Sequence, residues 1–185
     1  DKVLSNLSIN ANELNYGEPI NLSAQFTLAD KQPISALPVK LEVKRNNGSA
    51  WSEIASFTTG NDGKVGLQLY LGIDQSIRFR SEGTWDRLEG ISNEQAIRIK
   101  PQIKINVPTS AQVGSKINIS GLASPGKQIP ISLERYDGKW REISKGVTDE
   151  NGLYSFSYMV TSGPFLKMRA SAGGSTSAAV TVVIR

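Results

Sequence analysis

The chain has 185 residues, contains neither cysteine nor histidine, and carries a formal net charge of +4. The missing cysteines exclude disulfides and thiolate metal sites, and the missing histidines remove the usual general base and the commonest ligand of zinc and copper. Charged residues are spread along the chain without a basic run, which favours an ordinary soluble surface over a nucleic-acid site, with weak attraction to anionic cell-wall polymers as the alternative.

Apolar and polar residues alternate through most of the chain, and no helical periodicity of useful length occurs. In chain order, the alternating segments of the first half cover residues 7–9, 20–28, 39–43, 65–71, 77–79 and 97–99, and those of the second half cover 103–107, 117–119, 129–133, 154–160, 166–170 and 180–184. With 51–57 and 140–147 added, each half has seven predicted strands. Tight hairpin turns are predicted at Asn46-Asn47-Gly48, Asn61-Asp62-Gly63, Asp137-Gly138 and Asn151-Gly152.

The second half repeats the first. Residues 16–23 return as 113–120, Trp51 returns as Trp140, 59–63 return as 148–152, and 77–80 return as 166–169. We therefore expect two domains, 1–100 and 101–185. The predicted fold class is all-β: two tandem seven-stranded immunoglobulin-like antiparallel β-sandwiches. Because Pro101 follows the last strand of the first copy without any Gly/Ser-rich segment, we expect a short stiff linker.

The order of these motifs resembles the tandem immunoglobulin-like (Ig-like) repeats of secreted and cell-surface proteins of bacteria. The resemblance covers both copies nearly end to end, although Gly60 stands where such repeats commonly have aspartate, and Val113 replaces the aromatic residue of position 16. The resemblance implies an exported protein whose repeats serve as stalks, spacers, adhesins or accessory modules of hydrolases. The chain begins at Asp1 without methionine or a signal-like segment, as expected of a mature product or a piece of something longer.

The candidate ligand-binding residues are Trp85, Asp86 and Arg87. They lie in a polar loop that has no aromatic counterpart in 172–175. An unpaired loop tryptophan beside two charges is typical of sugar stacking or protein contact, and the alternative is that Trp85 caps its own sandwich. If the seven strands run antiparallel in succession, alternate loops lie at the same end of the domain. The long loops 29–37, 59–63 and 81–93 are therefore expected together at the free tip of the first domain, as an end-on binding surface would require. Neutral long loops are an equally simple explanation.

Other motifs favour structural roles. Trp51 and Trp140 occupy equivalent places, which is typical of packing in the core or on its flank. The oxygen-rich segments 61–63 and 149–152 lack the spacing of a calcium loop and are predicted as turns, with a weak calcium site as the alternative. We predict no catalytic residues, no metal site and no cofactor.

The sequence therefore predicts a non-catalytic, extracellular or cell-surface tandem Ig-like module acting as a structural spacer or stalk. One alternative is a glycan- or protein-binding adhesion module that uses the tip loops around Trp85. Another is a pair of accessory domains of a secreted hydrolase. The expected partners are cell-wall polysaccharide or another surface protein, without nucleic acid or membrane insertion, and the expected state is a monomer or part of a longer chain.

Overall fold

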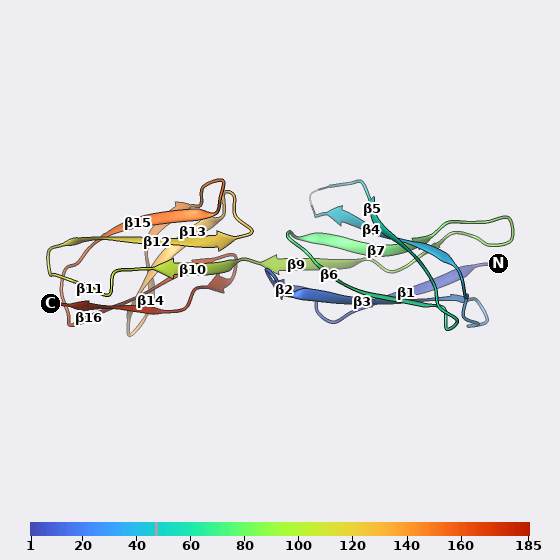
Figure 1. Ribbon diagram of the computed structural model, residues 1–185, viewed down its shortest axis with the longest axis horizontal. Coiled ribbons are helices and arrows are strands. Elements are labelled where there is room, and N and C mark those ends of the chain that lie inside the picture. Colours follow the sequence, from blue (N-terminus) through green and yellow to red (C-terminus); the bar gives the residue numbers. More distant parts are fainter. Residues whose placement is uncertain (47) are drawn as a thin grey trace. The chain divides into compact units, whose positions relative to one another are not determined.

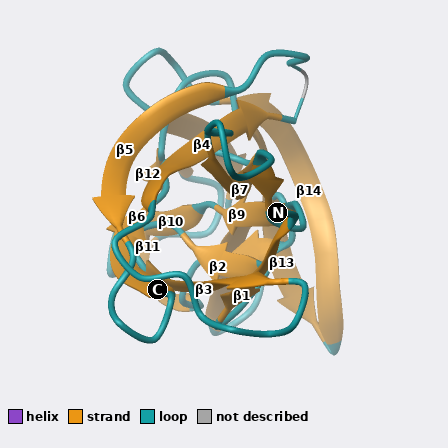
Figure 2. Ribbon diagram, turned by 90° about the vertical axis from the view of Figure 1, so that its right-hand side faces the viewer, coloured by secondary structure: helices purple, strands orange, loops and turns teal. Residues whose placement is uncertain are grey.

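The computed structural model describes residues 1–46 and 48–185, and within them all regular structure is β-strand (Figure 2). The chain divides into two compact units, Asp1–Ile99 and Lys100–Arg185, which we call domain 1 and domain 2. Each is a β-sandwich of two sheets whose long strands pair antiparallel, and the short strand β11 (Ser110–Ala111) pairs in parallel with β18 (Val180–Ile184) (Figure 1). None of the described residues forms a helix that is long and apolar enough to span a membrane.

Domain 1 is built from seven long strands and two short ones. In chain order they are β1 (Val3–Ile9), β2 (Glu13–Asn15), β3 (Pro19–Leu28), β4 (Pro38–Arg45), β5 (Ser52–Thr58), β6 (Lys64–Tyr70), β7 (Gln75–Ser81), β8 (Gly90–Ile91) and β9 (Gln95–Lys100). One sheet has the order β1-β3-β6, and the other has the order β2-β9-β7-β4-β5, with β8 added to β7. The predicted strands are the seven long ones.

Domain 2 repeats this topology. Its strands are β10 (Gln102–Asn106), β11 (Ser110–Ala111), β12 (Lys116–Ser124), β13 (Pro130–Asp137), β14 (Lys139–Val147), β15 (Leu153–Met159), β16 (Phe165–Ala172), β17 (Ser175–Thr176) and β18 (Val180–Ile184). The sheets are β10-β12-β15 and β11-β18-β16-β13-β14, with β17 added to β16. The short strands were not predicted, because two or three residues are too few to show an alternating pattern.

Each domain has its own hydrophobic core, formed by the inward residues of the alternating segments. In domain 1 the largest fully buried side chains include Phe26 and Phe79. In domain 2 they include Met168 and Leu133, with Tyr154 and Phe156 also buried. The predicted inward faces are confirmed, because period-2 alternation places one set of side chains between the two sheets.

Two of the predicted hairpins are not hairpins. Residues 59–63 and 148–152 connect strands of different sheets, so each turn crosses the edge of the sandwich. The buried Thr59 hydroxyl donates to Ile34 O at 2.6 Å and accepts from Leu37 N at 2.9 Å, which ties this turn to the preceding loop. Asp137-Gly138 is a hairpin turn, as predicted, and Gly138 has φ +68°. The predicted turn at Asn46-Asn47-Gly48 includes Asn47, which lies outside the described residues.

The structure also corrects the alignment of the two copies in one strand. Ser92 Oγ accepts from Phe79 N at 2.9 Å, and Ser177 Oγ accepts from Ala170 N at 3.0 Å, so Phe79 corresponds to Ala170. The segment 77–80 therefore matches 168–171, not 166–169. A shift of two residues keeps the same side chains facing inward, so the alternating pattern could not detect it.

We predict that the two domains fold independently. Cutting between Lys100 and Pro101 should give two fragments that each unfold cooperatively, because the buried side chains of each domain pack among themselves. Thermal melts of the separate fragments, followed by circular dichroism, test this. Failure of either fragment to melt cooperatively would contradict it.

Candidate functional site

Three long loops meet at one end of domain 1, together with the start of the chain. We call this surface, made of Asp1 and residues 29–37, 59–63 and 82–89, the N-terminal pole. Its loops are joined by backbone hydrogen bonds: Ala36 N donates to Thr59 O at 3.0 Å, and Leu88 N donates to Asp1 O at 2.8 Å. The strand order thus brings together the loops that the sequence analysis placed at one tip.

Trp85 lies at the apex of a tight turn in this pole. Thr84 N donates to Arg87 O at 2.8 Å, and this bond closes the turn around Trp85 and Asp86. The Trp85 side chain is 97% exposed. It therefore does not cap the sandwich, and the packing alternative for this residue is wrong.

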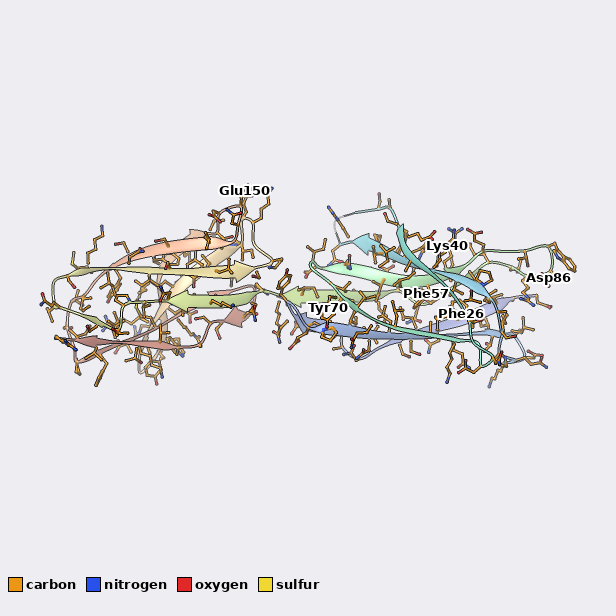
Figure 3. All side chains as sticks on the ribbon, in the orientation of Figure 1. Phe26, Lys40, Phe57, Tyr70, Asp86 and Glu150 are labelled. Atoms are coloured by element: carbon orange, nitrogen blue, oxygen red, sulfur yellow. The ribbon has the colours of Figure 1, made fainter. Side chains whose placement is uncertain are left out.

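The two charged candidates, Asp86 and Arg87, follow Trp85 in the chain and interact with each other and with Thr84. Thr84 Oγ1 donates to Asp86 Oδ1 at 2.6 Å, and this bond is the main cause of the lowered pKa of Asp86. Arg87 Nε lies 3.7 Å from Asp86 Oδ2. Asp86 lies at the same end of domain 1 as the start of the chain, since the Asp1 amino group donates to Asp86 O (Figure 3). The turn therefore presents an indole ring next to an ionised carboxylate and a guanidinium group.

An apolar groove of about 200 Å³ opens next to this turn. It is lined by Leu37, Pro38, Val39, Lys40, Ser56, Phe57, Glu82, Gly83 and Thr84. Phe57 is half-buried and packs edge-on against Phe79, with 6.3 Å between the ring centroids. Thr84 lines the groove and Trp85 follows it in the chain, so the groove lies next to the turn that carries the indole.

An ion pair borders the groove. Lys40 Nζ lies 2.6 Å from Glu82 Oε1 and 3.2 Å from Glu53 Oε2. The hydrogen bond from Lys40 lowers the pKa of Glu82, and the same bond is the largest cause of the raised pKa of Lys40. Sequence reasoning missed Lys40, Phe57 and Glu82, because alternation places a residue on a face but does not reveal which loop covers it.

Domain 2 has a hollow at the equivalent place, with different chemistry. It measures about 470 Å³ and is lined by Pro130, Ile131, Ser132, Lys145, Gly146 and residues 171–176. Gly146 pairs with Ile131 as Phe57 pairs with Val39, so glycine replaces the ring that lines the groove of domain 1. The loop corresponding to 82–89 is reduced to Gly173-Gly174. The exposed tryptophan and the apolar groove are therefore features of domain 1.

The chain matches no family model and no curated protein. Solved structures do match it. The crystal structure of a tetra-tandem repeat in the extending region of a large adhesion protein has a TM-score of 0.52 and 14% identity over 98% of this chain. Together with the two sheets of each domain, this match shows that the fold is that of tandem Ig-like repeats.

Two further solved structures match with lower TM-scores. The adhesin InvE of Yersinia pseudotuberculosis has a TM-score of 0.46 and 13% identity, and the D0-D1 domain of intimin has 0.38 and 15%. The alignments cover 58% of the InvE chain, 48% of the tetra-tandem repeat and 97% of the intimin chain. This chain thus spans about half the length of the first two. At these identities the likeness shows the fold alone.

Proposed function

We propose that this protein is a non-catalytic structural module of an exported bacterial surface protein, in which two Ig-like domains act as a spacer. The observation that carries this proposal is where the chain enters and leaves each domain. In domain 1, Leu88 N bonds to Asp1 O at one pole, and Asp74 Oδ1 accepts from Ile99 N at 2.7 Å at the other. A domain entered at one pole and left at the other can be joined in series without rearrangement.

The same path occurs in domain 2. A Cβ built on Gly173 would lie 3.1 Å from Pro101 Cδ, so the entry of the chain lies beside the loop after β16. Arg185 N donates to Ala111 O at 2.9 Å, so the end of the chain lies beside β11. An extracellular location is supported by the fold, since the tetra-tandem repeat that it resembles belongs to the extending region of a large adhesion protein.

A display experiment tests the spacer function. The chain would be inserted between a cell-wall anchor and an epitope tag, and antibody access to the tag would be compared with that for domain 1 alone and for the anchor alone. A spacer predicts that access rises with the number of domains and is unchanged by Trp85→Ala. Equal access in all three fusions would contradict the proposal.

A second function, glycan or protein binding at the N-terminal pole, is favoured by the 97% exposure of Trp85 beside the apolar groove. Folding gains almost nothing from an indole that remains in water, whereas tryptophan is among the residues that contribute most at binding interfaces. Asp86 and Arg87 would provide polar contacts at the rim of such a site. The groove would take the apolar part of the ligand.

We predict that Trp85→Ala abolishes saturable binding of the chain to bacterial cell walls, insoluble polysaccharides or a purified surface protein. Loss of a central tryptophan costs about 2 kcal/mol or more, or roughly 30-fold in affinity. The melting temperature should stay within about 2 °C, because the side chain is exposed.

Tyr70→Ala provides the matched control, since Tyr70 is another exposed aromatic residue of domain 1, with 67% exposure. It should leave binding unchanged. Equal binding by the parent protein and Trp85→Ala would contradict recognition at this pole and leave the spacer function intact.

A further inference from the structure

A second group of exposed aromatic side chains lies on domain 2, on the outer surface of the sheet that contains β13, β14, β16 and β18. Figure 1 shows the strands of this sheet. We call Tyr136, Trp140, Phe165, Lys167 and Val183 the aromatic face. Phe165 is 63% exposed, Tyr136 44% and Val183 41%. Phe165 pairs with Val183 across the sheet, and alternation puts Lys167 on the same side as Phe165.

The cations of this face are held over its rings. Lys167 Nζ lies 5.4 Å from the centroid of Tyr136 and 6.0 Å from that of Trp140. The guanidinium carbon of Arg169 lies 4.2 Å from the centroid of Trp140, while its Nε donates to Glu134 Oε2 at 2.6 Å. Glu134 is thus neutralised, whereas Lys167 has no carboxylate within ion-pair distance among the described residues. Lys167 is the cation of this face that remains available to an anion.

Folding explains only part of this arrangement. Tyr136 and Trp140 are paired across the β13–β14 hairpin, with ring centroids 5.3 Å apart, and such a pair stabilises the hairpin. Phe165 has no ring partner among the described residues, and its pairing partner Val183 is itself exposed. Leaving a phenyl ring in water forgoes most of its hydrophobic stabilisation, so the exposure of Phe165 is better explained by a ligand.

Domain 1 shows that the fold does not require this chemistry. Strand pairing shows which residues of domain 1 correspond to those of the aromatic face. Lys44 corresponds to Tyr136, Asp74 corresponds to Phe165, and Arg98 corresponds to Val183. Lys44 forms an ion pair with Glu94 at 3.2 Å, and Arg98 with Glu13 at 3.6 Å. The tryptophan with an arginine over its ring is common to both domains, since Arg78 lies 4.1 Å from the Trp51 centroid. The other aromatic and apolar residues of the face are specific to domain 2.

The net charge is also concentrated in domain 2. Residues 100–185 contain eleven Lys and Arg against five Asp and Glu, a net charge of +6, whereas residues 1–99 contain ten against twelve, a net charge of −2. Charged residues are thus spread along the whole chain, but the net positive charge lies in domain 2. A strongly positive domain attracts polyanions at a distance, and the aromatic face lies on that domain.

We propose that the aromatic face binds an acidic polysaccharide. Tyr136 and Phe165 would stack on the apolar faces of sugar rings, and Lys167 would pair with a carboxylate or phosphate of the polymer. Thr181 pairs with Lys167, and its hydroxyl can bond to a sugar hydroxyl. Ser132 and Ser171 donate to Glu142 and Glu134 at 2.8 Å, so their hydroxyl oxygens can only accept from a sugar hydroxyl. A protein interface would instead be expected to surround its aromatic residues with a desolvated apolar centre. The site is separate from the N-terminal pole of domain 1.

The test measures binding of the whole chain to immobilised polygalacturonate, a phosphomannan and neutral dextran at about 0.15 M salt, where weak non-specific attraction is screened. We expect saturable binding to at least one of the two anionic polymers, and the preferred polymer identifies carboxylate or phosphate as the anion. Phe165→Ala and Lys167→Ala should each weaken the affinity roughly five- to tenfold. Both variants should retain the parent melting temperature, because both side chains are exposed.

Two matched variants control for charge and aromatic content. Lys116→Ala removes an exposed cation from β12, in the other sheet of domain 2, and Tyr70→Ala removes an exposed ring from domain 1. Each should change the affinity less than twofold. The proposal is overturned if neither anionic polymer binds, if dextran binds equally well, if Lys116→Ala weakens binding as much as Lys167→Ala, or if Phe165→Ala has no effect. The chain would also be tested on bacterial wall extracts. If that binding is lost when the extract is treated with protease but survives digestion of its polysaccharides, the face binds a protein partner instead.

Discussion

Replacement of Gly152 by alanine should unfold domain 2 at a temperature at which the Gly114→Ala variant is still folded. Gly152 has φ +83°, and a Cβ on it would lie 2.3 Å from Ala123 O and 2.8 Å from Gly126 Cα. Both neighbours are backbone atoms, so they cannot move aside cheaply. Gly152 O also accepts from Ala123 N at 2.9 Å, and this bond holds the turn against β12.

Gly114 is the matched control. It has φ +79°, and nothing lies within 4 Å of the position its Cβ would occupy. Gly114→Ala therefore measures the cost of the left-handed conformation alone, about 1–2 kcal/mol. Gly152→Ala adds the backbone overlap, for a total of about 3–5 kcal/mol. The difference corresponds to a fall of ~10 °C or more in melting temperature for a domain of this size, measurable by calorimetry. Equal losses in the two variants would show that the turn adapts to a side chain.

This glycine also explains a motif that the two copies share. Gly63 has φ +72°, and its carbonyl accepts from Phe26 N at 2.8 Å, as that of Gly152 accepts from Ala123 N. The threonine four residues earlier is buried in each copy, and its hydroxyl bonds to the loop that precedes β4 in domain 1 and β13 in domain 2. The repeated Thr-x-x-x-Gly pattern is therefore a structural anchor for a turn between sheets. Its conserved spacing says nothing about binding.

Alternation was sufficient to predict the long strands and their inward faces, because burial between two sheets imposes a period of two. It could not distinguish a hairpin from a turn between sheets, since both join two alternating segments through Asx-Gly residues. Nor could alternation show that Phe79 of β7 corresponds to Ala170 of β16. The aromatic face of domain 2 depends on the pairing of β16 with β13, because that pairing places Lys167 over the ring of Tyr136.

The candidate site was predictable only in outline. The absence of an aromatic residue from 172–175 singled out Trp85, and the strand order predicted which loops surround it. Its 97% exposure and the groove beside it follow from the turn that Thr84 and Arg87 close, which no pattern of residue types reveals. The uneven charge of the two domains could be counted from the sequence once the boundary was placed.

The two cores reach similar packing with aromatic residues in different strands. Phe26 and Phe79 of domain 1 correspond to Ala123 and Ala170 of domain 2, both buried. In domain 2 the rings come from β15, where Tyr154 and Phe156 lie 5.8 Å apart, at the places of Val65 and Leu67 in β6. Gly121 makes room for Tyr154, since a Cβ on it would lie 2.3 Å from the phenolic oxygen. Burial raises the pKa of Tyr154, so the hydroxyl stays protonated and donates to Lys104 O at 2.7 Å.

Phe79→Ala should accordingly destabilise domain 1 severely, although domain 2 folds with alanine at that place. The Phe79 ring is fully buried, with its centroid 6.5 Å from that of Phe26 and 6.3 Å from that of Phe57. Removing it leaves a cavity that Val65 and Leu67 are too small to fill, at a cost of about 3–5 kcal/mol. Calorimetry of the whole chain should show the domain 1 transition falling by more than ~12 °C while that of domain 2 stays in place.

Ile54→Ala is the control, because this side chain of β5 is 50% exposed, and it should shift neither transition appreciably. If Phe79→Ala lowered both transitions together, the two domains would unfold as one cooperative unit, and their independence as spacer modules would have to be given up.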